Sequence, residues 1–90
     1  MLKFKEIKKD IKNGYHYMEY SGVWYDMQYT ITLDNDTIVF IFEWDYIPNK
    51  WIHEHDSIFS MKISDFIAIK SYKEYVKKIN ECIYYNTYCN

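Results

Sequence analysis

The fold of this chain is decided by residues 23–45, which read VWYDMQYTITLDNDTIVFIFEWD. Apolar and polar residues alternate over 23–33, which is the period of a strand with one buried face. Residues 34–36 are short and polar, and such side chains favour a turn because they bond their own backbone. Residues 37–45 are apolar on both faces for much of their length. They are expected to pair with 23–33 as a central strand that is covered on both sides.

The flanking segments predict the rest of an antiparallel sheet and two helices. Residues 15–20 are aromatic and extended in character, and Ser21 with Gly22 suits a two-residue hairpin turn after them. Residues 57–63 alternate like another strand. Residues 2–13 carry apolar side chains at helical spacing among lysines, and residues 72–85 do so over a longer stretch.

Capping signals refine the C-terminal half. Ser71 is followed three residues later by Glu74, which is the pattern of a capping box at a helix start. Ser64 and Asp65 could cap a brief helical turn over residues 66–69. The order helix, three to four strands, helix predicts an α+β fold, as a single small domain spanning residues 1–90.

Size and composition agree with one folded domain. The chain has 90 residues, is 49 % apolar and 21 % aromatic, and uses Lys but no Arg, which is typical of an AT-rich coding sequence. It shows no targeting segment and no apolar run long enough to span a bilayer, so a cytoplasmic protein is expected. Cys82 and Cys89 are then expected to be free thiols.

The charge is unevenly distributed along the chain. Residues 14–61 carry eight acids against one lysine, a net −7, whereas residues 1–13 and 62–90 are net +3 and +2. The strands are therefore acidic and the helices basic. An acidic surface with exposed aromatics favours a basic protein partner. The predicted partner-binding residues are Glu19, Trp24, Asp26, Asp34, Asp36, Glu43, Trp44 and Asp45.

A second interpretation of the same charges needs no partner. Lysine-rich helices that lie beside acidic strands would neutralise them, and solvated charge protects sheet edges from aggregation. In the binding interpretation, Asp26 shares an outward face with Trp24, and Glu43 shares one with Asp45. Homodimerisation through an aromatic face is a further option for a chain with 11 tyrosines.

One cluster has residue types that bind metal. On a strand, His53 and His55 would share a face and could hold Zn²⁺ with a third ligand such as His16 or Glu19. Their spacing is not that of a helical zinc motif, and histidines after Pro48 are more commonly loop residues. We therefore predict no metal and no cofactor.

Other chemistry has little support in the sequence. With two glycines, the chain has neither a phosphate-binding loop nor a nucleophile elbow, so no enzyme activity is predicted. Direct binding of nucleic acid is opposed by the negative charge of the aromatic strands. Membrane association is not expected either.

In length, composition and acidic run, the chain resembles the small phage-encoded inhibitors called anti-CRISPR proteins. The run consists of Glu19, Asp26, Asp34, Asp36, Glu43, Asp45, Glu54 and Asp56. The resemblance implies a CRISPR effector as partner and inhibition without catalysis in the host cytoplasm. It implies no residue roles.

The hypothesis that follows is a non-catalytic inhibitor of a basic, nucleic-acid-handling defence enzyme. Three alternatives stay open. One is an immunity protein or antitoxin for a basic toxin, one is a small metal- or ligand-binding protein that uses His53 and His55, and one is a structural accessory with no target beyond itself.

Overall fold

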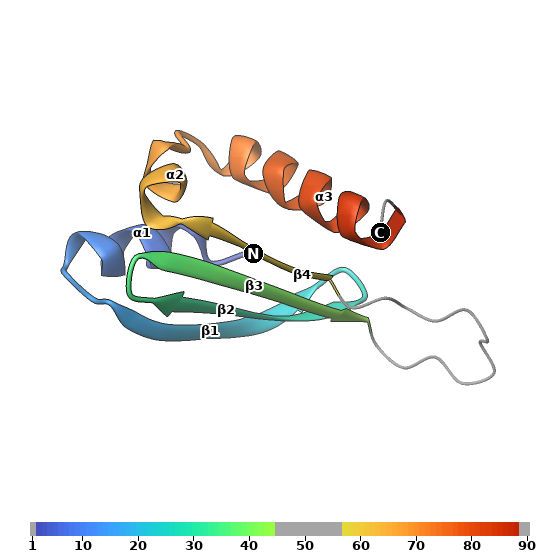
Figure 1. Cartoon of the computed structure of the whole chain (residues 1–90), viewed down its shortest axis with the longest axis horizontal. Helices are drawn as coiled ribbons and strands as arrows, with labels where there is room; N and C mark the ends of the chain where they lie inside the picture. Colours follow the sequence, from blue (N-terminus) through green and yellow to red (C-terminus); the bar gives the residue numbers. More distant parts are fainter. Residues whose placement is uncertain (1, 45–56, 89–90) are drawn as a thin grey trace.

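The computed structural model describes residues 2–44 and 57–88 and has the predicted α+β fold (Figure 1). Four antiparallel strands form one sheet in the order β1-β2-β3-β4, and three helices accompany it. In chain order the elements are α1 (Phe4–Lys12), β1 (Tyr17–Trp24), β2 (Met27–Asp34), β3 (Thr37–Trp44), β4 (Ser57–Lys62), α2 (Ile63–Ala68) and α3 (Tyr72–Tyr88). No described helix is long and apolar enough to cross a membrane.

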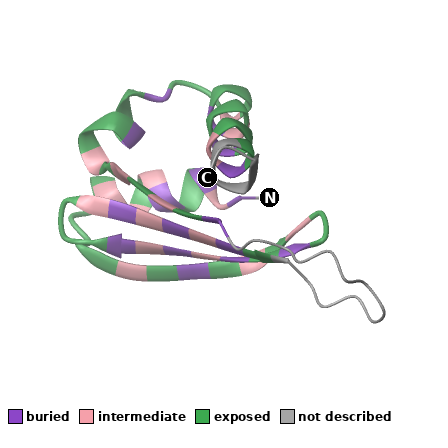
Figure 2. Cartoon of the chain, turned by 45° about the vertical axis from the view of Figure 1, so that its right-hand side comes forward, coloured by how far each residue is buried: buried purple, intermediate pink, exposed green. Residues whose placement is uncertain are grey.

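All three helices lie on the same side of the sheet (Figures 1 and 2). Burial follows this arrangement, because alternate residues of β2 and β3 are buried, and the corresponding residues of the two edge strands are buried or half-buried with exposed neighbours. The sheet side of the core includes Tyr20, Tyr29, Ile31, Phe40 and Phe42. Coverage of residues 37–45 on both sides is not found in the described part of the chain, where the outward residues Thr37, Val39 and Ile41 are half-buried.

The β2–β3 hairpin forms where the sequence predicts it. Asp34 and Thr37 pair across a two-residue turn of Asn35 and Asp36. Asn35 has a φ of 62°, a left-handed conformation that asparagine tolerates better than most residues. β3 then ends at Trp44, within one residue of the predicted bound.

The β1–β2 hairpin turns later than predicted. The turn is at Tyr25 and Asp26, and Tyr25 takes the left-handed conformation with a φ of 57°. Ser21 and Gly22 lie inside β1, so the predicted turn there is wrong, as is a single strand over 23–33. The alternation continues across the real turn because Val23 and Tyr25 are apolar, although both are exposed.

Gly22 has a packing role instead of a turn role. A Cβ atom on Gly22 would lie 2.7 Å from the Tyr29 Oη, and Tyr29 is its partner on β2. Close approach of a neighbouring side chain is a common reason for glycine inside a strand.

The predicted Ser71 cap opens α3, and the second bond of the capping box goes to Lys70 instead of Ser71. The Glu74 N–H donates to the Ser71 Oγ at 3.2 Å, and the Glu74 carboxylate accepts from the Lys70 N–H at 3.0 Å. The start of α2 differs from prediction: its N-cap residue is Lys62, with no side-chain cap, so Ser64 and Asp65 do not cap it.

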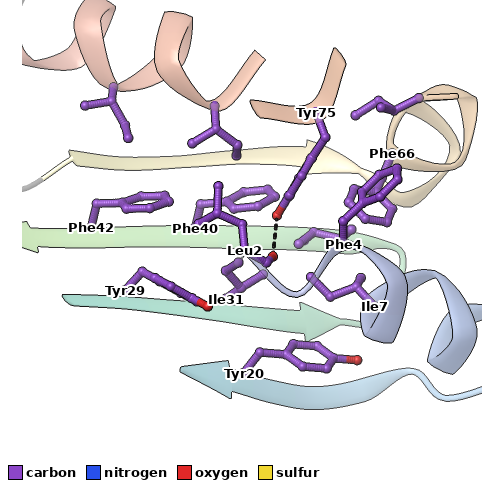
Figure 3. Packing of buried hydrophobic residues seen from close by; sticks show 14 of the residues in the cluster. Leu2, Phe4, Ile7, Tyr20, Tyr29, Ile31, Phe40, Phe42, Phe66 and Tyr75 are labelled. Carbon is purple, nitrogen blue, oxygen red and sulfur yellow. Dashed lines mark hydrogen bonds between the residues drawn. The ribbon is translucent and has the colours of Figure 1, made fainter. Parts of the chain in front are cut away.

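The core joins α1 to α2 and α3 (Figure 3). The Phe4 ring stacks on the Tyr75 ring with centroids 4.8 Å apart and meets the Phe66 ring edge-on at 5.6 Å. The buried Tyr75 hydroxyl donates to the Leu2 carbonyl at 3.1 Å. Lys8 Nζ donates to the carbonyls that end α2, those of Ile67 and Ile69.

Candidate functional site

The candidate site is the face of the sheet opposite the three described helices (Figure 2), which we call the open face. The register of the four strands aligns its side chains in four rows across the sheet. They are exposed or half-buried, whereas their neighbours along β2 and β3 are buried and those along β1 and β4 are buried or half-buried. The open face consists of Tyr17, Glu19, Ser21, Val23, Gln28, Thr30, Thr32, Asp34, Thr37, Val39, Ile41, Glu43, Ile58, Ser60 and Lys62.

The centre of the open face is apolar and β-branched. Ile41 on β3 pairs with Ile58 on β4, and Thr30 on β2 lies on its other side. Val39 occupies the next row of the same face. Ile58 is 60 % exposed, which is high for a large aliphatic side chain in a strand. An apolar centre within a polar rim is typical of a protein-binding surface.

The rim of the open face is acidic. Glu19, Asp34 and Glu43 are all exposed there, and Lys62 is the one basic residue of the set. The two hairpin turns add Asp26 and Asp36, at opposite ends of the sheet. The open face and its turns therefore hold five carboxylates against one ammonium group.

Main-chain contacts position both ends of the β2–β3 turn. The Ile63 N–H donates to the Asp36 carbonyl at 2.8 Å, and the Asn35 N–H donates to the His16 carbonyl at 2.9 Å. The Asp36 carboxylate thus extends from a turn whose backbone is hydrogen-bonded to the start of α2 and to the segment before β1.

The structure brings most of the predicted acids to one side but not the predicted tryptophans. Trp24 points to the helix-covered face, where its ring meets Phe42 edge-on with centroids 6.1 Å apart. Trp24 and Asp26 therefore do not share an outward face. Trp44 is opposite Met27 in the register, and its side chain, like Asp45, lies outside the described residues.

The aromatic character predicted for the binding surface is largely wrong. The aromatic residues Tyr20, Tyr29, Phe40 and Phe42 fill the core, because each large ring buries much apolar area there. Tyr17 is the aromatic residue of the open face as described, and it is 68 % exposed. The aliphatic residues of this face are Val23, Val39, Ile41 and Ile58, none of which was predicted as a partner-binding residue. The sequence signal for Val39 and Ile41 was the apolar character of residues 38–42 on both faces.

The candidate metal ligands are not brought together in the described part of the chain. His53 and His55 lie outside it. Of the two proposed third ligands, His16 is exposed between α1 and β1, and Glu19 lies on the open face. Residues 2–44 and 57–88 contain no group of three or more His, Cys, Asp or Glu side chains that could hold a metal ion.

A groove of about 410 Å³ lies beside one end of the open face, where the β2–β3 turn meets α1 and α2. Its apolar part comes from α1 and α2, and its polar rim from the turn and from β4. The lining residues are Ile11, Tyr15, His16, Asn35, Asp36, Lys62, Ile63, Ser64 and Ile67. This groove could not be predicted from the sequence, because its residues come from four separate segments.

Cys82 has the environment of a structural thiol. It is half-buried on α3, and burial raises the pKa of its thiol above the ordinary value. A raised pKa lowers the fraction of reactive thiolate at neutral pH. Cys89 lies outside the described residues.

No protein-family model, curated protein or solved structure matches this chain.

Proposed function

We propose that this protein is a non-catalytic inhibitor that binds a basic, nucleic-acid-handling bacterial defence enzyme through the open face. The observation that carries the proposal is the separation of charge between the two layers. Glu19, Asp34 and Glu43 lie on the uncovered face of the sheet, whereas nine of the ten lysines among the described residues lie outside that face. The anti-CRISPR type of inhibitor is the nearest description of this activity.

The arrangement of the layers weakens the interpretation in which helices neutralise the strands. The helices pack on the opposite face from the three carboxylates (Figure 2). Packed layers are separated by about 10 Å, which is about one Debye length at physiological salt. The helix lysines therefore screen the open face only weakly, and its negative potential extends into solvent.

The rim spans a length that suits a nucleic-acid-binding groove. Asp34 pairs with Thr37, and Glu43 is six residues further along β3, so the two carboxylates are separated by about 20 Å along the strands. An acidic rim of this length can occupy a basic groove in place of phosphates. The apolar centre at Ile41 and Ile58 then supplies contact area that phosphates lack.

The first test is capture of the partner from bacterial lysate with the tagged full chain. The open-face variant is the triple change Glu19→Lys, Asp34→Lys and Glu43→Lys. Its matched control reverses three exposed helix acids, Glu6→Lys, Asp65→Lys and Glu81→Lys, with the same change in net charge. We expect the control to retain the partner and the open-face variant to lose it.

The captured protein must then pass a functional test. We expect a nucleic-acid-handling enzyme whose activity falls when the wild-type chain is added. Its affinity for the chain should drop by about tenfold or more between 50 and 200 mM salt, because binding that depends on many charges is steeply sensitive to salt. Equal loss of capture by the control variant would contradict the role of the open face. Capture of a basic toxin would contradict the choice of target.

A further inference from the structure

We propose that the β1 edge is a self-association site, at which β1 pairs antiparallel with β1 of a second copy and extends the sheet across both copies. This inference does not depend on the proposed function. It rests on the edge position of β1, on its backbone, and on the symmetry of its exposed side chains.

β1 is an edge strand with few of the usual protections, since Glu19 is its one charged residue. The strand order places it at one border of the sheet, with only β2 beside it (Figure 1). It is eight residues long, pairs with β2 at every position without a bulge, and contains neither Pro nor Lys. Natural edge strands are usually short, bulged, or guarded by Lys or Pro. The opposite edge, β4, is six residues long and ends in Lys62.

The backbone of β1 presents its free hydrogen-bonding groups in a regular array. In a two-residue hairpin the residues that flank the turn form a hydrogen-bonded pair, here Trp24 and Met27. Hydrogen-bonded pairs then recur at every second residue. The residues between them, Tyr17, Glu19, Ser21 and Val23, therefore direct their N–H and C=O groups away from the sheet.

Exposed apolar side chains concentrate on and around this edge. Among the described residues, seven large hydrophobic side chains are exposed. Four of them lie within residues 15–25: Tyr15 is 51 % exposed, Tyr17 68 %, Val23 61 % and Tyr25 80 %. Such a concentration at a sheet edge indicates a surface that a partner covers.

The four residues are symmetric about Tyr20. Tyr17 and Val23 are three residues before and after it, and Tyr15 and Tyr25 are five before and after. In an antiparallel pair centred on Tyr20, Tyr17 of each copy is opposite Val23 of the other. Aromatic residues opposite β-branched residues are a favourable cross-strand combination. Tyr15 and Tyr25 extend the symmetry past the ends of the strand.

The charges also fit this register. Glu19 of each copy is opposite Ser21 of the other, so no two carboxylates on the strand face each other directly. The free backbone groups match as well, because the residues with outward N–H and C=O groups pair only with one another. An interface with twofold symmetry requires a strand that is complementary to itself. Binding of an unrelated peptide strand would not require this symmetry.

The test measures association of the purified full chain by sedimentation equilibrium, with no other partner present. We expect a wild-type dimer whose dissociation constant rises at least tenfold in Ser21→Pro. The Ser21 N–H points away from β2, so this proline blocks the edge while leaving the β1–β2 hydrogen bonds in place. The matched control is Ser60→Pro, at an equivalent outward position on β4, and it should dimerise like the wild type.

A second variant decides the question if a proline variant fails to fold. Tyr17→Lys with Val23→Lys changes two exposed side chains and places Lys opposite Lys in the dimer, so it should be monomeric with an unchanged circular dichroism spectrum. Its control, Ile58→Lys, should remain dimeric. A wild-type chain that is monomeric at hundreds of micromolar would overturn the proposal, as would a dimer that tolerates both Ser21→Pro and the double lysine change. Neither result would affect the proposed inhibition.

Discussion

At the scale of single residues, position 22 of β1 has room for glycine but not for a larger side chain. The Tyr29 ring, which is buried, occupies the space that a Gly22 side chain would need. We expect Gly22→Ala to lower the free energy of unfolding by about 1–3 kcal/mol, because a packed core relaxes poorly around added volume. Ser21→Ala, at the exposed neighbouring position, should change it by less than about 0.5 kcal/mol. Urea denaturation of both variants measures the difference, and equal midpoints would contradict the close approach.

The same region shows why the turn could not be predicted from sequence. Ser21 and Gly22 carry a stronger turn signal than Tyr25 and Asp26, because tyrosine rarely adopts a positive φ. The structure places Tyr25 in the left-handed conformation because the pairing of β1 with β2 requires a two-residue turn there. Tertiary pairing thus overrides the local preference.

At the scale of elements, the two serine-containing helix starts make a matched pair. Ser71 accepts a hydrogen bond from the Glu74 N–H, whereas Ser64 lies inside α2 and caps nothing. We expect Ser71→Ala to cost about 1 kcal/mol of stability, which is typical for loss of an N-cap. Ser64→Ala should cost much less, since both serines are exposed. If both variants lose a similar amount of unfolding free energy in thermal or urea denaturation, the hydrogen bond at the α3 cap contributes little.

Elements with local signals were predicted well. The β2–β3 hairpin and the start of α3 each depend on residues within a few positions of one another, Asp34 to Thr37 and Ser71 to Glu74. The existence of four strands and of the flanking helices also follows from local periodicity.

The assignment of β1 side chains to the two faces of the sheet was predicted less well, because it depends on the position of the β1–β2 turn. Moving the β1–β2 turn exchanges the two faces of the strand before it. Trp24 was therefore assigned to the outside and lies inside, while the acidic count of the central segment was unaffected. The groove at the β2–β3 turn could not be predicted, since its lining depends on long-range packing.

At the scale of the whole molecule, buried tyrosines set an alkaline limit to stability. Burial raises the pKa of Tyr75 and of Tyr29, and burial together with a 2.6 Å hydrogen bond to Asp10 raises that of Tyr20. In the unfolded chain these hydroxyls ionise near pH 10. Above that pH the unfolded state has released protons that the folded state still holds, so stability falls as pH rises.

The Tyr75→Phe variant tests this expectation. It loses the hydrogen bond to the Leu2 carbonyl, so it should be less stable at pH 7 by about 1 kcal/mol. Between pH 10 and 11.5, however, its stability should fall less steeply than that of the wild type, by up to about 1.4 kcal/mol per pH unit. Urea denaturation across this range gives both slopes, and parallel curves would contradict the assignment to Tyr75.

The hydrogen bond between Tyr75 and Leu2 also bears on the order of folding. It joins groups 73 residues apart in sequence, whereas the β2–β3 hairpin closes over a two-residue turn. Chain entropy must be lost before such a distant contact contributes, so local hairpins are expected to nucleate early and distant docking to come late. Until α3 is in place, α1 has no Tyr75 ring to stack on, and the aromatic side of the sheet stays open to solvent. A transient species of this kind is prone to aggregate, and its lifetime is governed by how rapidly α1 and α3 meet.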